Sequence, residues 1–259
     1  MQYFVIDAFT DRLFSGNPAG VCLLENWPEA AVMQSIAMEN NLSETAFLVR
    51  ESSGAYGLRW FTPETEIDLC GHATLASAFV LMNEVQAVSG SVEFHTKSGT
   101  LTVSQSGDVF TMDFPSRPPV PCEVPPRLEQ ALGASILEAH ASRDLLVLLE
   151  NEDAVRNLRP DFSLLKQLKD VFAVIVTARG TDCDFVSRFF APGIGVPEDP
   201  VTGSSHSTLI PFWRARLGKK QMIARQLSAR GGTLMCEYCG DRVKIGGTAV
   251  CYLRGEINL

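Results

Sequence analysis

The sequence has none of the long apolar segments by which membrane proteins are recognised, and it is poor in positive charge. No apolar run approaches the ~20 residues that a membrane-spanning helix requires. Lys and Arg number 22 against 30 Asp and Glu, which gives a formal net charge of −8. A nucleic acid or an anionic membrane surface would call for a basic face. We therefore expect neither a nucleic-acid nor a membrane partner.

Motifs of several large enzyme classes are also missing. The sequence contains no phosphate-binding P-loop, no dinucleotide fingerprint and no Gly-x-Ser-x-Gly elbow of the serine hydrolases. Cys236 and Cys239 have CxxC spacing, but there is no second pair and no nearby histidine. This pattern is more typical of a strand or a turn than of a metal or redox site.

A disulfide framework is not indicated either. The seven cysteines are an odd number scattered along the chain, which favours reduced thiols. Residues 1–9 lack the basic segment of a signal peptide and have the pattern of a strand. With 259 residues, 46% of them hydrophobic, the chain has enough apolar material for a sizeable core. We expect a globular, cytoplasmic protein.

Strand patterns outnumber helix patterns. An amphipathic helix is predicted from Pro28 to residue 40, with Met33 and Met38 as core filler. Two markedly apolar helices are predicted over residues 71–83 and 203–217. The proline-rich residues 114–121 are the best candidate for a linker. The predicted strands cover residues 2–9, 19–24, 45–49, 56–61, 91–96, 99–105, 109–114 and 248–259.

Short segments of the first half recur, in the same order, in the second half. The recurring pairs are Leu23-Leu24-Glu25-Asn26 with Leu148-Leu149-Glu150-Asn151, Arg59-Trp60-Phe61-Thr62-Pro63 with Arg188-Phe189-Phe190-Ala191-Pro192, and Cys70-Gly71 with Thr202-Gly203. Three matches in order, ending at the same predicted helix start, indicate a duplicated domain.

This pattern predicts an α+β fold. A helix that is apolar on most sides has to be surrounded by other elements. We predict two pseudo-symmetric lobes, each a curved mixed sheet wrapped around one central helix, with an active-site cleft between them. The first lobe would cover residues 1–115, completed by the C-terminal strand, and the second would cover residues 116–259.

Each apolar helix follows an acidic loop, which suggests an anion site. The first turn of a helix has backbone N–H groups without intrahelical partners and carries partial positive charge. Gly71 and Gly203 would let a ligand approach this backbone closely. We therefore predict that the two helix starts face each other and bind a small anionic substrate.

Four motifs in register along the chain carry a family resemblance. They are Gly16-Asn17-Pro18-Ala19-Gly20-Val21, Asn41-Leu42-Ser43-Glu44-Thr45-Ala46-Phe47, Asp68-Leu69-Cys70-Gly71-His72-Ala73-Thr74 and Glu198-Asp199-Pro200-Val201-Thr202-Gly203-Ser204. Together they resemble the phenazine-biosynthesis PhzF-like family, which is part of the diaminopimelate-epimerase-like superfamily. The resemblance extends from Met1 to the C-terminus.

The resemblance implies an isomerase without cofactor or metal, usually a homodimer. In similar members, the glutamate of the Ser-Glu-Thr motif moves a proton between carbons of a dihydro-hydroxyanthranilate. Carried onto this chain, that glutamate is Glu44, and the other catalytic positions are His72 and Asp199. The substrate-binding positions that the resemblance implies are Gly71, Ala73, Gly203, Ser204 and Asn17.

The residues by themselves leave other roles open. Glu44 precedes an apolar strand that would bury it partly, as a base for a carbon acid requires, but the local sequence alone favours an exposed turn residue. His72 could move a proton or be satisfied by Asp68. Asp199 could orient the substrate or cap a turn, and Ser204 could cap the helix.

Asn17 and Cys70 can be explained by structural roles alone. Asn17 could shape the cleft, but it also fits the turn before Pro18. Cys70 lies where two-thiol racemases of the superfamily place one of their cysteines, but the matching position is Thr202. A symmetric cysteine pair is therefore excluded, and Cys70 is predicted to be a small buried residue.

Two alternative functions compete with the isomerase. One is a catalytically silent protein that binds a small anion on the same fold. The other is a hydrolase that uses Ser204, since Ser204, Ser205, His206 and Asp199 together invite a triad, although adjacent residues on one helical turn rarely align as nucleophile and base.

Overall fold

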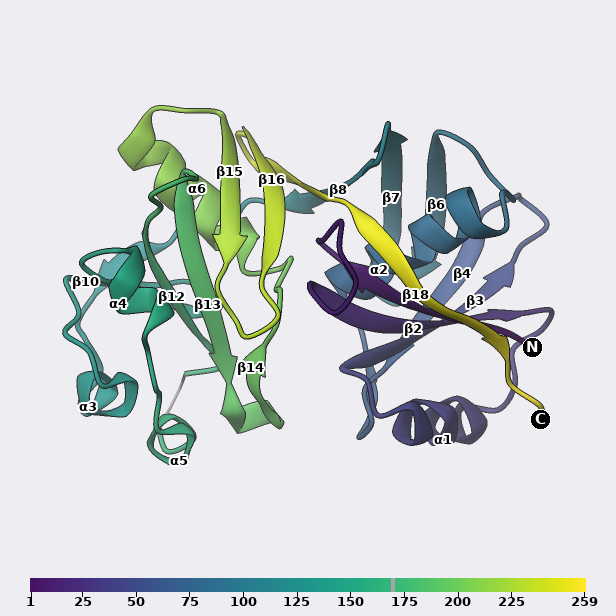
Figure 1. Ribbon diagram of the computed structural model, residues 1–259, viewed down its shortest axis with the longest axis horizontal. Helices are drawn as coiled ribbons and strands as arrows, with labels where there is room; N and C mark the ends of the chain where they lie inside the picture. Colours follow the sequence, from purple (N-terminus) through teal and green to yellow (C-terminus); the bar gives the residue numbers. More distant parts are fainter. Residues whose placement is uncertain (169–170) are drawn as a thin grey trace. The chain divides into compact units, whose positions relative to one another are not determined.

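The chain forms two compact units. A computed structural model describes residues 1–168 and 171–259. Its first unit comprises Met1–Asp113 together with Gly246–Leu259, and its second comprises Phe114–Ile245 (Figure 1). The division lies two residues before the predicted boundary at 115, and the C-terminal segment belongs to the first unit. Among the described residues, no helix has the length and hydropathy of a membrane span.

The first unit is a mixed sheet with two main helices. Its strands pair in the order β18–β1–β2–β3–β4–β6–β7–β8, with β2–β3 and β4–β6 parallel and the other pairs antiparallel. The elements are β1 (Gln2–Ala8), β2 (Asn17–Leu24), α1 (Ala30–Asn40), β3 (Glu44–Arg50), β4 (Tyr56–Phe61), β5 (Glu66–Ile67), α2 (Gly71–Phe79), η1 (Val80–Glu84), β6 (Ser91–Thr96), β7 (Gly99–Ser106), β8 (Val109–Pro115) and β18 (Ala249–Glu256).

The second unit repeats this arrangement. Its strands pair in the order β9–β10–β11–β12–β13–β15–β16, with β11–β12 and β13–β15 parallel. The elements are β9 (Val120–Cys122), α3 (Leu128–Leu132), β10 (Glu138–Ala141), β11 (Leu145–Leu148), α4 (Glu152–Arg156), α5 (Phe162–Leu165), β12 (Val174–Arg179), β13 (Phe185–Ala191), η2 (Pro192–Ile194), β14 (Val196–Asp199), α6 (His206–Leu217), β15 (Gln221–Gln226), β16 (Gly232–Cys239) and β17 (Arg242–Gly247).

The strand register supports the duplication that the sequence indicates. Leu23, Leu48 and Leu58 are neighbours across β2, β3 and β4, and Leu148, Thr177 and Ser187 are neighbours across β11, β12 and β13. An ion pair is repeated as well. Arg59 binds Glu66 through Nε at 2.7 Å and NH2 at 2.9 Å, and Arg188 binds Glu198 with the same two distances. The fold is α+β, as predicted.

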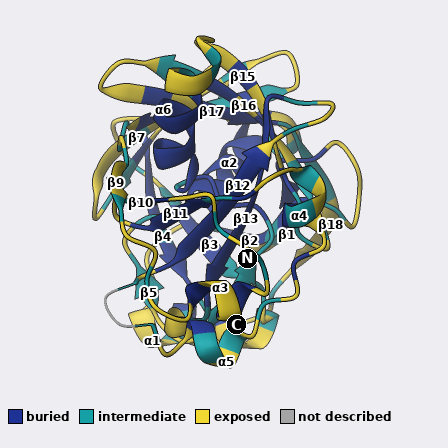
Figure 2. Ribbon diagram, turned by 90° about the vertical axis from the view of Figure 1, so that its left-hand side faces the viewer, coloured by how far each residue is buried: buried dark blue, intermediate teal, exposed yellow. Residues whose placement is uncertain are grey.

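Helix α2 lies at the centre of the first unit. All nine of its residues are buried, and it contacts strands β1, β2, β3, β7 and β18 (Figure 2). Its alanines and glycine let these strands approach closely. Its buried hydroxyls stay satisfied, because Thr74 donates to the carbonyl of Cys70 at 2.6 Å and Ser77 donates to that of Ala73 at 2.7 Å. The predicted helix ends in a wider π-turn, η1.

Helix α6 begins at His206, so the prediction that it starts at Gly203 is wrong by three residues. Residues 203–205 form a tight turn before the regular helix, with His206 N–H donating to the Gly203 carbonyl at 3.0 Å. Pro211 within α6 has no N–H for the carbonyl of Ser207. The amide of Arg117, from the proline-rich segment, donates to that carbonyl at 2.8 Å instead.

The two methionines of α1 differ in burial. Met33 is fully buried in a cluster with Cys22, Ile36 and Phe47, as predicted. Met38 is 60% exposed, so its prediction as core filler is wrong. The helical spacing between the two positions turns Met38 away from the sheet.

We expect Met33→Ala to destabilise the fold and Met38→Ala to leave it nearly unchanged. Truncation at Met33 removes buried methylenes and leaves a cavity, which costs about 2–5 kcal/mol. The exposed position should change the free energy of unfolding by less than about 0.5 kcal/mol. Urea unfolding followed by circular dichroism measures both, and equal effects would show that α1 packs differently.

Candidate functional site

Glu44 lies at the start of β3, immediately after the turn that follows α1. Asn41 ends α1 in the left-handed conformation, with φ 49°, which asparagine tolerates and which turns the chain into the strand. Glu44 is then paired with Ala19 of β2. Its side chain is 14% exposed. The reading of Glu44 as an exposed turn residue is therefore wrong.

His72 lies in the first turn of α2 and faces Glu44. Its ring is 5% exposed, and its Nε2 atom is 3.0 Å from Oε2 of Glu44. The other ring nitrogen, Nδ1, is 3.1 Å from the side-chain amide of Asn17. The acid beside His72 is thus Glu44, from a different strand, and not the nearby Asp68 that sequence reasoning offered as an alternative.

Asn17 is positioned by a backbone constraint. The preceding Gly16 has φ +67°, and a Cβ there would lie 2.2 Å from the carbonyl oxygen of Ala8. Only glycine fits this close approach. The constraint lets β2 begin at Asn17, which is fully buried.

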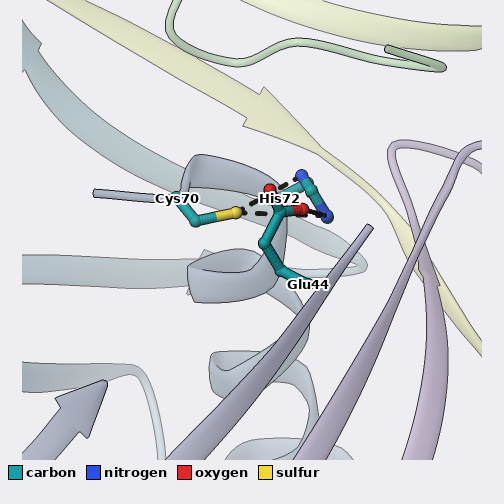
Figure 3. A group of neighbouring side chains, drawn as sticks. All are labelled: Glu44, Cys70 and His72. Carbon is teal, nitrogen blue, oxygen red and sulfur yellow. Dashed lines mark hydrogen bonds and ion pairs between the residues drawn. The ribbon is translucent and has the colours of Figure 1, made fainter. Parts of the chain in front are cut away.

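Cys70 completes a cluster that sequence reasoning did not assemble (Figure 3). Its Sγ atom is 3.5 Å from Nδ1 and 4.0 Å from Nε2 of His72. Cys70 is buried, as predicted, but it contacts the site directly. The signal that could have found this contact is its position at the N-cap of α2, two residues before His72.

Burial and charge act in opposite directions on this cluster. Burial, with the charge of Glu44 adding to it, raises the pKa of the Cys70 thiol to about 11. Burial also lowers the pKa of His72, but its interactions with Cys70 and Glu44 outweigh burial and hold this pKa well above the ordinary value. The neighbouring carboxylate of Glu44 therefore favours the protonated form of His72.

The contact between His72 and Glu44 leaves the carboxylate of Glu44 able to accept a further hydrogen bond. Oε2 of Glu44 is within ion-pair distance of His72, yet it accepts no hydrogen bond of good geometry from any described residue. A buried carboxylate oxygen with a spare lone pair can accept a proton from a bound molecule. The amides of Gly71 and His72, at the start of α2, also donate to no acceptor in the described part of the chain.

The predicted residues of the second unit lie around the turns before α6. Thr202 donates its hydroxyl to Asp199 at 2.5 Å, and the side-chain nitrogen of Gln226 donates to the Asp199 carbonyl at 2.8 Å. The hydroxyl of Ser204 accepts from Arg143 at 3.3 Å. Asp199 thus closes a turn within its own unit, and its predicted catalytic role stays a prediction, as do the binding roles of Ala73, Gly203 and Ser204.

Arg143, which contacts Ser204, is a second residue that the sequence did not point to. Its guanidinium is held by the buried Asp144 through two hydrogen bonds of 3.0 and 2.7 Å, and it lies 5.3 Å from the ring centre of Phe172. Its NH1 group donates to no acceptor within residues 1–168 and 171–259. No motif pointed to it, because it precedes a strand far from Ser204 in the sequence.

The hydrolase arrangement is not formed. Nδ1 of His206 is 2.8 Å from the carbonyl of Thr202, and burial lowers the pKa of His206 to about 4. Ser204 contacts Arg143 instead of a histidine. His206 is therefore a neutral core residue, packed against Phe185.

The cysteines agree with the predicted reduced state. All seven are free thiols. Cys236 is buried and Cys239 exposed, and both lie in β16, as the predicted strand requires. Three positions apart, they point to opposite faces of the strand and do not form a pair.

Comparison with known proteins places the fold and the site in context. Residues 6–255 match the family model described as phenazine biosynthesis-like protein. An uncharacterized isomerase of Pseudomonas aeruginosa is 49% identical over 259 residues, covering 100% of this chain and 99% of that protein. A crystal structure of a PhzF family phenazine biosynthesis protein from Enterococcus faecalis has a TM-score of 0.97 and 50% identity, covering 100% of this chain and 99% of that one.

A more distant neighbour shares the fold alone. A probable proline racemase from Agrobacterium radiobacter has a TM-score of 0.67 at 10% identity, covering 100% of this chain and 93% of that one.

We expect the pKa of His72 to lie above the ordinary value of 6.5 and the pKa of His206 to lie below it. His72 should remain protonated well above that pH, so any stability it contributes is present below 6.5 and is lost as pH rises through its folded pKa. The folded pKa of His206 is depressed, so its contribution is present above 6.5 and is lost as pH falls toward about 4.

The ring-proton NMR signals of the histidines, recorded across this pH range, measure both titrations. His72→Gln and His206→Gln assign the two resonances by their loss. A His72 signal that titrates below 6.5 would show that burial, and not the neighbouring anions, dominates the site.

Proposed function

The chain belongs to the phenazine biosynthesis-like family and is an isomerase, and we propose that it moves a proton between two carbons of a small carboxylate-bearing substrate, with Glu44 as the general acid and base. The substrate class that we propose is a ring resembling a dihydro-hydroxyanthranilate. No cofactor takes part in this proposal. The observation that carries it is the partly buried carboxylate of Glu44, 3.0 Å from His72 at the start of a fully buried helix.

Glu44 has the chemistry that the first step needs. Its carboxylate takes a proton from one carbon, and the electron pair of that C–H bond moves into the conjugated system of the substrate. The same carboxyl group then returns the proton to another carbon, which shifts the double bond and restores the carboxylate. A base held in this way typically contributes ~10²–10⁴ in rate.

His72 and the helix start would stabilise the charge that develops. A protonated ring beside Glu44 favours its ionised form and can donate to an enolate-like oxygen. The unpartnered amides of Gly71 and His72 offer donors to a substrate carboxylate, and a helix N-terminus contributes about 0.3–1 kcal/mol toward an anion. The binding role of Asn17 would be indirect, because its amide lies against Nδ1 of His72.

The second unit would supply binding groups. We propose that Ser204 and Gly203 bind an anionic group, as the family resemblance implies, and that Arg143 adds a guanidinium beside Ser204. Support comes from the free NH1 group of Arg143 and from the two carboxylate contacts that fix its orientation. Asp199 would orient a polar substituent. A homodimer remains a prediction from the family resemblance.

The competing proposal is a silent anion-binding protein on the same fold. The names of the relatives favour an enzyme, and the Glu44–His72 pair supports catalysis because a simple anion site would gain nothing from a second buried negative charge. Incorporation of solvent deuterium into a bound carbon acid separates the two functions, since a pure binder leaves its ligand unlabelled.

Glu44→Gln should retain the fold and bind ligand but lose turnover by about 10²–10⁴-fold, because the amide cannot accept the proton. Solvent deuterium exchange into dihydro-hydroxyanthranilate and related cyclohexadiene carboxylates measures this loss. Glu51→Gln is the matched control. Glu51 also faces a histidine, His95 at 2.8 Å, but on the surface, so this variant should keep full activity. Near-normal turnover of Glu44→Gln would refute the role of Glu44.

Arg143→Gln should raise KM for a carboxylate substrate about 10-fold or more and change kcat little, because an ionic hydrogen bond contributes about 1.5–3 kcal/mol to binding. Arg156→Gln is a suitable control, because Arg156 forms an ion pair with Glu152 on the short helix α4. Steady-state kinetics with the carboxylate and with its neutral amide separates a charge effect from a loss of structure. An equal effect on both substrates would contradict the proposed contact.

A further inference from the structure

We propose that Glu44, Cys70 and His72 form a binding site for a thiophilic divalent cation of the zinc type, and that an ion bound there inhibits the isomerase. The inhibition, but not the binding, rests on the function proposed above for Glu44. The site lies wholly within the first unit, at the start of β3 and the first turn of α2.

The three side chains offer a mixed donor set. One sulfur, one imidazole nitrogen and one carboxylate oxygen lie within 4.8 Å of one another. Thiolate and imidazole ligands suit Zn²⁺ and Cd²⁺, whereas Mg²⁺ and Ca²⁺ prefer oxygen ligands alone. This donor set therefore selects a borderline or soft cation over the hard ones.

The spacing suits a tetrahedral centre. With Zn–N and Zn–O distances near 2.0–2.1 Å and Zn–S near 2.3 Å, neighbouring ligand atoms are roughly 3.3–3.6 Å apart. Nε2 of His72 is 3.0 Å from Oε2 of Glu44 and 4.0 Å from Sγ of Cys70. These two separations lie on either side of the ideal range, and all three ligand atoms lie within 4.8 Å of one another, so binding of one ion requires the side chains to draw closer together.

The surroundings also favour a cation. Oε2 of Glu44 is buried without a hydrogen bond of good geometry among the described residues, and a metal ion would satisfy it. The side chain of Asn17 lies 3.1 Å from Nδ1 of His72 and restricts the orientation of the ring. Three protein ligands leave a fourth position for water or for a substrate oxygen.

Binding of the cation releases two protons from its ligands. The cation forms bonds to Sγ, Nε2 and Oε2, the thiol proton and the Nε2 proton leave to solvent, and no electron is transferred. The lone pair of Glu44 that would take the substrate proton is then bound to the metal. The isomerase with an occupied site has no free base.

Cobalt(II) titration of the full-length protein tests the site directly, because thiolate–cobalt bonds give a charge-transfer absorption in the near ultraviolet that does not depend on activity. We expect this absorption to saturate at one equivalent. It should be lost in Cys70→Ser and kept in Cys239→Ser, which removes an exposed cysteine elsewhere. Zn²⁺ should displace the cobalt and abolish the band.

Absence of the band in the wild-type protein, or its persistence in Cys70→Ser, would overturn the site. Turnover is measured in parallel, with activity expected to fall in step with the band and to return on chelation. Turnover is expressed relative to the same protein without metal, and Cys70→Ser should lose a smaller fraction of its own turnover than the wild-type protein at the same metal concentration. A saturable, Cys70-dependent band without loss of turnover would uphold the site and count instead against Glu44 as the base.

Discussion

The contact between Glu44 and His72 depends on the burial of α2. A carboxylate and an imidazole 3.0 Å apart, 14% and 5% exposed, attract each other strongly because little water screens them. The same burial imposes a desolvation cost that only good placement of both groups offsets. The placement comes from two neighbouring constraints. Strand β3 begins at Glu44 after a left-handed asparagine, and α2 is enclosed by strands of the first unit.

The duplication supplies a similar scaffold in both units. The strand order, the register and the Arg59–Glu66 ion pair are all repeated in the second unit. The position of Glu44 is not repeated. Following the register, Ala173 stands where the first unit has Glu44, so only one copy of the repeat carries an acid at this position.

Elements that are marked by neighbouring residues in the sequence were predicted correctly, and features that depend on packing were not. Strands β3, β4, β6 and β7 were predicted within a residue or two, because alternation, glycine and proline mark them directly. Met38 was assigned to the core because helical spacing alone does not say how wide the buried face is. The start of α6 was misplaced because the tight turns before it use the same small polar residues that cap a helix.

The sequence by itself indicated the α+β class and a duplicated domain, because periodicity and recurring segments are local signals, and its resemblance to the family pointed to Glu44 and His72 as candidate catalytic residues. Only the tertiary structure decided which groups touch. It brought Cys70 and Asn17 to the same histidine ring, set Arg143 against Ser204, and made His206 a neutral core residue. The physical reason is that burial and strand pairing, which fix these contacts, join residues far apart in the chain.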